Sequence, residues 1–158
     1  RVLGDINTLY KDNPLDVDGT AIFRTFDGVR GIIRTSQIAT GEENNITLAV
    51  YGDKGALKWA QENPTVLHHL KEGEPEQIYK AGNSYNQPFT QESTKLAPGH
   101  PEGLIDAMGN IYSGVAKAVR SQPHHAGAFP SVTDGVRGMK FIEAVLRSNR
   151  EGQVWVNL

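Results

Sequence analysis

Apolar and polar residues alternate along much of the first half of the chain, which indicates β-strands as far as about residue 79. Residues 20–26 and 29–38 form two alternating runs that meet at Asp27-Gly28. Because this dipeptide tolerates positive φ, we predict a hairpin closed by a two-residue type I′ turn. The β-rich half of the chain is therefore expected to pair neighbouring strands in antiparallel fashion.

A second hairpin is predicted from residues 46–51 and 56–60, connected by Gly52-Asp53-Lys54-Gly55. The alternation places one set of apolar side chains on a single face of the first strand: Ile46, Leu48 and Val50. Residues 66–70 and 77–79 are weaker strand candidates. The polar segment 81–99, rich in Asn, Gln and Ser, is expected to be an irregular loop.

In the second half the apolar residues recur every three or four positions, which indicates amphipathic helices. A first helix is expected to begin after Pro101 and to end near Pro123. Its apolar stripe consists of Leu104, Ile105, Met108, Ile111, Tyr112, Val115 and Val119.

A second helix is predicted over residues 132–149, because Ser131 and Asp134 match a capping pattern and Gly152 follows the end. Its predicted buried face consists of Val136, Met139, Ile142, Val145 and Leu146. A short strand over residues 153–157 is expected to close the chain.

Strands first and helices afterwards predict an α+β domain, in which an open, mostly antiparallel sheet has the two main helices packed on one face. The 158 residues have the length of one domain and can bury about two-thirds of the surface that the unfolded chain exposes. Large apolar residues lie on both sides of several predicted strands, for example Ile22 and Phe23. We therefore expect the uncovered sheet face to bind a partner subunit or a ligand.

Composition argues against several classes of function. Sixteen basic and eighteen acidic residues give a formal charge of −2, without a block of like charge, so nucleic acid is not an expected partner. The chain has no cysteine, which rules out disulfides and thiolate chemistry and fits a cytoplasmic protein. No apolar run approaches the roughly 18 to 20 residues of a membrane span. No G-x-G-x-x-G motif occurs, so the chain alone is not expected to bind a dinucleotide.

Four segments together carry a resemblance to a known family: SQIATGEEN (36–44), LAVYGDKGALKW (48–59), GHPEG (99–103) and FPSVTDGVRGMKFIEAVLRSNREGQVWVNL (129–158). In their order and spacing they resemble the C-terminal domain of the glucose-fructose oxidoreductase, inositol dehydrogenase and MocA (Gfo/Idh/MocA) family. The resemblance covers nearly the whole chain. Each segment alone is a weak signal, since YGDKG by itself is only a hairpin.

The resemblance implies that residues 1–158 are a single C-terminal substrate-binding and oligomerisation domain, and that an N-terminal Rossmann domain binding NAD or NADP belongs to the parent protein. It implies a sugar, cyclitol or related polyol as substrate, and a homo-oligomer formed through the open sheet face. In the family a Lys from an E-K-P motif, an Asp and a His handle the proton. None of these can be placed in this sequence, so no catalytic residue is assigned and the chain alone is expected to be inactive.

A polyol pocket needs amides, carboxylates and an imidazole, because a buried hydroxyl left unpaired costs about 1 to 3 kcal/mol. Such groups gather at a strand end and the loop after it: Gln37, Glu42, Glu43, Asn44 and Asn45. A solvated loop would have the same composition. His100, just ahead of a predicted helix, is assigned to the pocket on the family resemblance, and the alternative is that it caps its own turn.

Two pairs of adjacent histidines, His68-His69 and His124-His125, invite a metal interpretation. Neither pair has helical i, i+4 spacing with a carboxylate, and neighbours on a strand point to opposite faces, so no metal site is expected. His124 and His125 could still reach a pocket if the segment between the two helices folds back over the sheet.

Two other functions stay open for the chain. One is a non-catalytic binding or assembly module that shares only the fold with the family. The other, implied by the resemblance, is a fragment of an NAD-dependent glycosidase.

Overall fold

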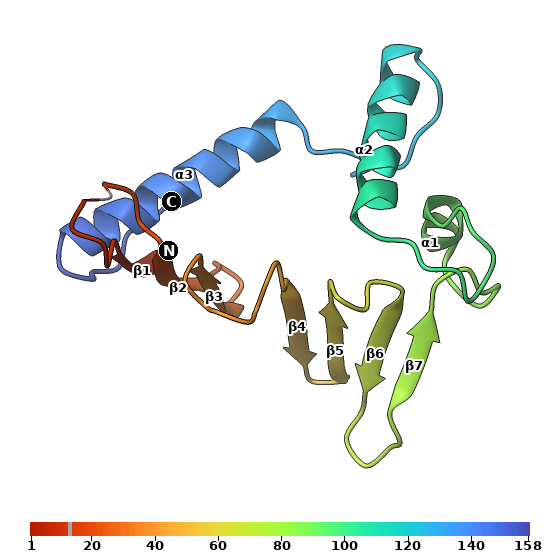
Figure 1. Cartoon of the computed structure of the whole chain (residues 1–158), viewed down its shortest axis with the longest axis horizontal. Coiled ribbons are helices and arrows are strands. Elements are labelled where there is room, and N and C mark those ends of the chain that lie inside the picture. The colour runs from red at the N-terminus through yellow and green to blue at the C-terminus, as the bar shows by residue number, and fades with distance from the viewer. Residues whose placement is uncertain (13) are drawn as a thin grey trace. The chain divides into compact units, whose positions relative to one another are not determined.

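A computed structural model describes residues 1–12 and 14–158 of the chain, which form two compact units (Figure 1). The first unit combines Arg1–Gly41 with Pro130–Leu158, and the second unit is Glu42–Phe129. Each unit has its own antiparallel sheet and is described by itself.

The sheet of the first unit has the order β1-β2-β3, with β1 at Val2–Asn7, β2 at Asp18–Arg24 and β3 at Arg30–Ser36. The predicted hairpin of β2 and β3 is confirmed, but its turn type was wrong. Thr25 N donates to Val29 O at 3.0 Å, which leaves a three-residue loop in which only Gly28 has positive φ, at 93°. A type I′ turn would require positive φ at Asp27 as well.

Helix α3, at Val132–Arg150, has the predicted capping box. Asp134 N donates to Ser131 Oγ at 3.2 Å, and Ser131 N donates to the Asp134 carboxylate at 2.9 Å. The Ser131 hydroxyl also donates to the Asp134 carboxylate, at 2.7 Å, and this hydrogen bond, together with the one from Ser131 N, lowers the pKa of Asp134 below its ordinary value. The helix ends as predicted, with Gly152 in the left-handed region at φ 86°.

The core of the first unit lies between α3 and β1, which run alongside each other (Figure 1). Its members are Val2, Ala144 and Val156, flanked by Phe141 and Val145. The predicted buried face of α3 was wrong in part, since Val136, Met139 and Ile142 are about half exposed. The face of α3 that packs carries the small residues Ala144 and Ser148, which let the helix approach β1 closely.

Ser148 joins α3 to β1 through the most buried polar group of the described chain. Its hydroxyl accepts a hydrogen bond from Gly4 N at 2.9 Å and donates to Val154 O at 2.5 Å. The predicted last strand is reduced to a single bridge, in which Val2 and Val156 exchange two main-chain hydrogen bonds of 2.8 Å. Buried polar groups in this core are thus satisfied by their neighbours.

The second unit contains a meander of four antiparallel strands in chain order, seen side by side in Figure 1. The strands are β4 (Thr47–Gly52), β5 (Gly55–Ala60), β6 (Val66–Leu70) and β7 (Gln77–Lys80). The predicted second hairpin is confirmed, and Gly52 pairs with Gly55 across its tip. Register also aligns one apolar row across all four strands: Leu48, Trp59, Leu67 and Tyr79.

Two helices complete the second unit: α1 at Pro88–Ser93 and α2 at Leu104–Val119. The position of α2 agrees with the prediction, but much of its apolar stripe is exposed, as at Ile105 and Val119. The prediction of an irregular loop over residues 81–99 was wrong at α1. Pro88 supplies a fixed φ at the first position of this short helix.

The predicted fold class, α+β with antiparallel strands, is confirmed. The strands form two sheets instead of one, and the segment between β3 and β4 contains two residues at positive φ, Gly41 and Glu43. In the described residues, α3 is the helix that packs extensively on a sheet of its own unit. No described helix is long and apolar enough to cross a bilayer.

Candidate functional site

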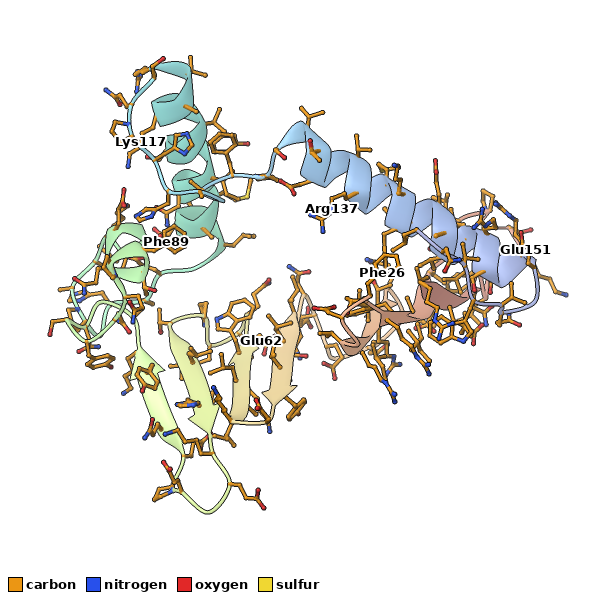
Figure 2. The ribbon with its side chains drawn as sticks, turned by 180° about the vertical axis from the view of Figure 1, so that it is seen from behind. Phe26, Glu62, Phe89, Lys117, Arg137 and Glu151 are labelled. Carbon is orange, nitrogen blue, oxygen red and sulfur yellow. The ribbon has the colours of Figure 1, made fainter. Side chains whose placement is uncertain are left out.

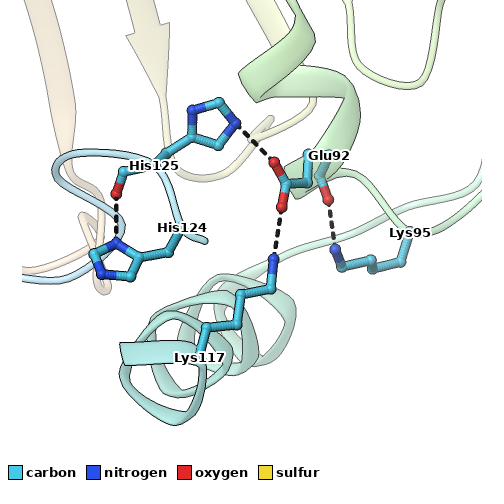
Figure 3. A network of polar contacts seen from close by, with 5 residues as sticks. All are labelled: Glu92, Lys95, Lys117, His124 and His125. Atoms are coloured by element: carbon cyan, nitrogen blue, oxygen red, sulfur yellow. Dashed lines mark hydrogen bonds and ion pairs between the residues drawn. The ribbon is translucent and has the colours of Figure 1, made fainter. Parts of the chain in front are cut away.

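Charged side chains of the second unit gather around Glu92, in the last turn of α1. Lys117 Nζ lies 2.7 Å from Glu92 Oε1, and His125 Nε2 lies 2.7 Å from Glu92 Oε2, so that each carboxylate oxygen has its own partner (Figure 3). Lys95 Nζ donates to the Glu92 main-chain oxygen, and His124 Nδ1 donates to the His125 oxygen at 3.1 Å. One carboxylate thus connects α1, the end of α2 and the segment after α2. These five residues are called the Glu92 cluster below.

Close packing brings the segment after α2 back onto that helix. A Cβ atom at Gly114 would lie only 3.0 Å from side-chain carbons of both Ala128 and Phe129, so the absence of a side chain permits this approach. Aromatic contacts hold the two histidines. The His125 ring lies edge-on to Phe89, with centroids 4.9 Å apart, and His124 contacts Phe129 at 5.5 Å.

The Glu92 cluster borders a small pocket of about 60 Å³. Polar side chains from α2, Asn110 and Ser113, line it together with Ser93, and Asn110 donates to Ser93 O at 2.7 Å. The pocket is far smaller than the roughly 300 to 1,000 Å³ of typical ligand sites. It fits a water molecule or one functional group of a larger ligand.

The Glu92 carboxylate is an acceptor in this site. The hydrogen bond and the positive charge of Lys117 lower the pKa of Glu92 below its ordinary value of 4.5, and His125 acts more weakly in the same direction. Since both side-chain oxygens are occupied by donors, an ionised Glu92 orients Lys117 and His125 toward the pocket. The Glu92 carboxylate can therefore position the hydrogen-bond donors Lys117 and His125. Because it is ionised near neutral pH, it has no proton to give as a general acid.

Glu92→Gln is expected to destabilise the second unit at neutral pH and to lose this effect in acid. A carboxyl with a lowered folded-state pKa contributes stability above its ordinary pKa of 4.5, and the contribution disappears as pH falls through the folded-state value. Thermal unfolding from pH 3 to pH 7 measures it. The wild type should melt higher than the variant at pH 7, and the two should converge in acid.

The control for this prediction is Glu62→Gln, which removes an exposed carboxylate that forms none of the ion pairs found among the described residues. Its difference from wild type should be small at all pH values. A Glu92→Gln difference that stays constant from pH 7 to pH 3 would contradict the proposed role of the Lys117 charge.

The four residues predicted from the sequence to bind substrate, Gln37, Glu42, Asn44 and His100, do not line this pocket. Gln37 is an exposed residue of the first unit, and its main-chain nitrogen donates to Val17 O at 2.7 Å. Glu42 and Asn44 are exposed at the start of the second unit. The Glu42 carboxylate accepts from Asn45 Nδ2 at 2.8 Å, and Asn44 O accepts from the Gln61 side chain at 2.8 Å. The loop is ordered by its own polar groups.

His100 is exposed, and its ring is hydrogen-bonded within its own turn. Nδ1 donates to Ala97 O at 3.1 Å, and the His100 main-chain nitrogen donates to the same oxygen at 3.2 Å. This arrangement fixes the ring orientation. Nε2 has no hydrogen-bond partner in the part of the chain that the structure describes.

Sequence reasoning missed three members of the Glu92 cluster, namely Glu92, Lys95 and Lys117. It left open whether His124 and His125 reach a pocket by a fold-back of their segment over the sheet; both line the small pocket, which is bounded by helices. The available signal was the turn of residues 120–127, which is short enough to return the chain to the end of α2. Glu92 itself lies in the polar segment 81–99, where no motif or apolar periodicity indicates a functional residue.

The other histidine pair behaves as neighbours on a strand do. His68 Nδ1 lies 2.8 Å from a Glu76 oxygen, and His69 Nδ1 lies 3.2 Å from a Gln77 oxygen. The two rings therefore engage different partners on opposite faces of β6. Within residues 1–12 and 14–158, no cluster of three or more metal-ligating side chains suited to an ion is found.

Solved structures of oxidoreductases share this antiparallel α+β fold. Residues 8–158 match the family described as the oxidoreductase family, C-terminal alpha/beta domain, of the Gfo/Idh/MocA proteins. The chain belongs to this family, and the resemblance found in the sequence is confirmed.

Similar proteins are longer than this chain. An uncharacterized oxidoreductase, YfiI, of Bacillus subtilis (strain 168) is 28% identical over 149 residues, which cover 90% of this chain and 38% of YfiI. The crystal structure of an oxidoreductase from Sinorhizobium meliloti has a TM-score of 0.92 and 29% identity, over 99% of this chain and 45% of its own. An inositol dehydrogenase homolog from Azotobacter vinelandii, complexed with NADH and myo-inositol, has a TM-score of 0.83 and 23% identity. The match covers 99% of this chain and 43% of that protein's chain. The chain thus spans less than half the length of these proteins.

Proposed function

We propose that this chain is the C-terminal part of an NAD(P)-dependent oxidoreductase that acts on a sugar, cyclitol or related polyol. The observation that carries the proposal is the family match over residues 8–158. The complex of the Azotobacter vinelandii homolog with NADH and myo-inositol supports the cofactor and the substrate class, because its fold extends over 99% of this chain.

In this proposal, residues 1–158 are one substrate-binding and oligomerisation domain, and the nicotinamide cofactor binds to an N-terminal Rossmann domain of the longer cytoplasmic protein. The lack of a G-x-G-x-x-G motif in the chain supports this division. The hydride passes between the nicotinamide and a carbinol carbon of the substrate. The catalytic residues belong to the longer protein, and this chain contributes substrate contacts.

The proposed substrate contacts are Gln37, Glu42, Asn44 and His100. All four are exposed, and they offer the amide, carboxylate and imidazole groups that hydroxyls require. Because Nδ1 of His100 donates to Ala97 O, a neutral ring leaves Nε2 as an acceptor for a substrate hydroxyl. The ring is already held in place, so little ordering would be required on binding.

His100→Ala in the full-length protein is expected to lower kcat/KM by about tenfold to a hundredfold, because a substrate hydroxyl would lose its partner. The affinity for NADH should not change. Steady-state kinetics with a polyol substrate and calorimetric titration of NADH measure the two effects. His68→Ala, which removes an imidazole paired with Glu76, is the control and should leave kcat/KM close to wild type. An unaltered kcat/KM in His100→Ala would contradict the proposed substrate contact and would leave His100 with only a structural role in its turn.

An assembly role is supported by the apolar row of the second sheet. Leu48 is 61% exposed and Tyr79 is 37% exposed, so these side chains are available to a second copy of the chain. A non-catalytic assembly module is the second candidate function. Assay of the full-length protein against a polyol panel with NAD⁺ and NADP⁺ separates the two, since turnover supports the oxidoreductase, and an inactive oligomer supports the module.

A further inference from the structure

His100 lies in the loop that joins α1 to α2. Residues 94–103 form this loop, between the helices on which Phe89 and Lys117 are labelled in Figure 2. These residues lie outside the helices and strands of the structure, so the shape of the loop depends on hydrogen bonds from side chains and on packing. Such contacts therefore decide how the His100 ring is placed.

The Glu102 carboxylate connects the end of this loop to its beginning. Its Oε1 atom accepts hydrogen bonds from two successive main-chain nitrogens, Lys95 N at 2.6 Å and Leu96 N. Two successive N–H groups directed at one oxygen form an anion-binding arrangement of the main chain. Hydrogen bonds to a charged acceptor are about twice as strong as those between neutral groups. Glu102 thus fixes the main chain at the start of the loop.

Two other contacts attach the loop to the rest of the second unit. Asn110 of α2 donates to Ser93 O at 2.7 Å, at the point where α1 ends and the loop begins. A Cβ atom at Gly82 would lie 3.1 Å from Pro98 N and 3.4 Å from Leu96 O, so the turn after β7 packs closely on the main chain of the loop. Because these contacts hold the loop on two sides, the hydrogen bonds to Glu102 can set its path between them.

The His100 ring depends on the part of the loop that Glu102 fixes. Nδ1 of His100 donates to Ala97 O at 3.1 Å, and the His100 main-chain nitrogen donates to the same oxygen at 3.2 Å. A carbonyl oxygen only accepts, so Nδ1 carries a proton and Nε2 of the neutral ring is an acceptor. Ala97 directly follows Leu96, whose nitrogen is bound to Glu102. The direction of the Ala97 carbonyl, and with it the tautomer of His100, therefore follows from the carboxylate.

We propose that Glu102 is the positioning residue for His100. It holds Ala97 O where this oxygen keeps the proton on Nδ1 and leaves Nε2 to accept a hydrogen bond from a substrate hydroxyl. The effect on substrate rests on the proposed function, in which His100 contacts the polyol. Glu102 itself does not touch the substrate and acts through the main chain of its loop.

Histidine NMR of the full-length protein tests the positioning step without substrate. In spectra of the ¹⁵N-labelled rings at about pH 8.5, where histidine is ordinarily neutral, the signal that His100→Ala removes identifies His100. Wild type should show the Nδ1–H tautomer, and Glu102→Ala should show a mixture of both tautomers. Glu102→Gln retains an acceptor oxygen and should retain most of the Nδ1–H form. An unchanged tautomer in Glu102→Ala would overturn the proposal, whatever the substrate is.

Steady-state kinetics with the fastest polyol of the panel test the consequence for substrate. Glu102→Ala should lower kcat/KM about threefold to tenfold, less than His100→Ala, because the ring is present but less often correctly oriented. In a His100→Ala background, Glu102→Ala should change kcat/KM by less than about twofold, since its effect passes through His100. Additive losses would refute the proposal, because Glu102 would then act on the site independently.

Failure of the substrate contact and failure of the positioning step give different results. If His100→Ala alone leaves kcat/KM unaltered, the substrate contact is refuted and Glu102 has no role in binding the polyol. The tautomer measurement still decides whether Glu102 positions the ring, because it requires no turnover.

The matched control is Asp134→Ala in α3, which removes another carboxylate that accepts a main-chain hydrogen bond, from Ser131 N at 2.9 Å. Asp134→Ala and Glu102→Ala should lower the melting temperature by similar amounts, since each loses hydrogen bonds of the same kind. Only Glu102→Ala should change the His100 tautomer and kcat/KM. Equal changes of tautomer in the two variants would overturn the proposal, because they would reflect a general loss of stability.

Discussion

Gly4→Ala is expected to destabilise the first unit by about 3 kcal/mol, because it forces β1 and α3 apart. A Cβ atom at this position would lie 2.6 Å from Val145 Cγ1 and 2.8 Å from the Val145 main-chain oxygen. The side chain of Val145 can rotate, but its main chain can move only with the helix. Separation would also weaken the hydrogen bond from Gly4 N to the buried Ser148 hydroxyl.

Urea unfolding followed by Trp155 fluorescence measures this effect in a Trp59→Phe background. The matched control is Gly135→Ala in α3, where an added Cβ meets no atom within 4 Å. The same chemical change should stabilise the control by about 0.5 to 1 kcal/mol, since alanine is a better helix former than glycine. Equal midpoints for the two variants would contradict the close packing of β1 on α3.

Gly55→Ala is expected to destabilise the second unit by about 3 kcal/mol, for two reasons that act together. Gly55 has a φ of 139°, which residues with a side chain rarely adopt, and an added Cβ would lie 2.3 Å from the Leu70 main-chain oxygen. Leu70 is the register partner of Ala56, the next residue of β5. The substitution would therefore open the pairing of β5 with β6 at its end.

Trp59 reports on this change, because it lies in β5 and donates from its indole nitrogen to Pro64 O at 2.9 Å. Urea unfolding in a Trp155→Phe background should show a lower midpoint for Gly55→Ala. Gly52→Ala is the control, since Gly52 lies opposite Gly55 in the hairpin and its nearest atom to an added Cβ is 3.8 Å away. A similar midpoint for both variants would show that the β5–β6 pairing tolerates the added methyl group.

Local patterns predicted the elements of this fold well, because each has a local cause. The capping box at Ser131 and Asp134 set the start of α3, and alternation located the strands on both sides of Gly52 and Gly55. The pattern of α3 gave its packed face only in part: Val145 packs against the core as predicted, but close approach to β1 favours small residues such as Ala144 and Ser148. Which face of a helix packs depends on contacts between segments that are distant in the sequence, and the periodicity of apolar residues carries no information about those contacts.

The candidate sites were harder to predict for the same reason. The Glu92 cluster joins residues up to 33 positions apart, from Glu92 to His125, and depends on Gly114 permitting a close approach to Ala128. Sequence analysis gave more weight to the Gln37–Asn44 segment, whose polarity was visible locally.

Calorimetric titration of the 158-residue chain with NADH tests the central claim most directly, which is that this domain serves an oxidoreductase without holding its nicotinamide cofactor. The claim rests on family membership over residues 8–158 and on the missing G-x-G-x-x-G motif. The account predicts no binding heat up to millimolar NADH. Saturable binding of NADH with micromolar affinity would contradict it.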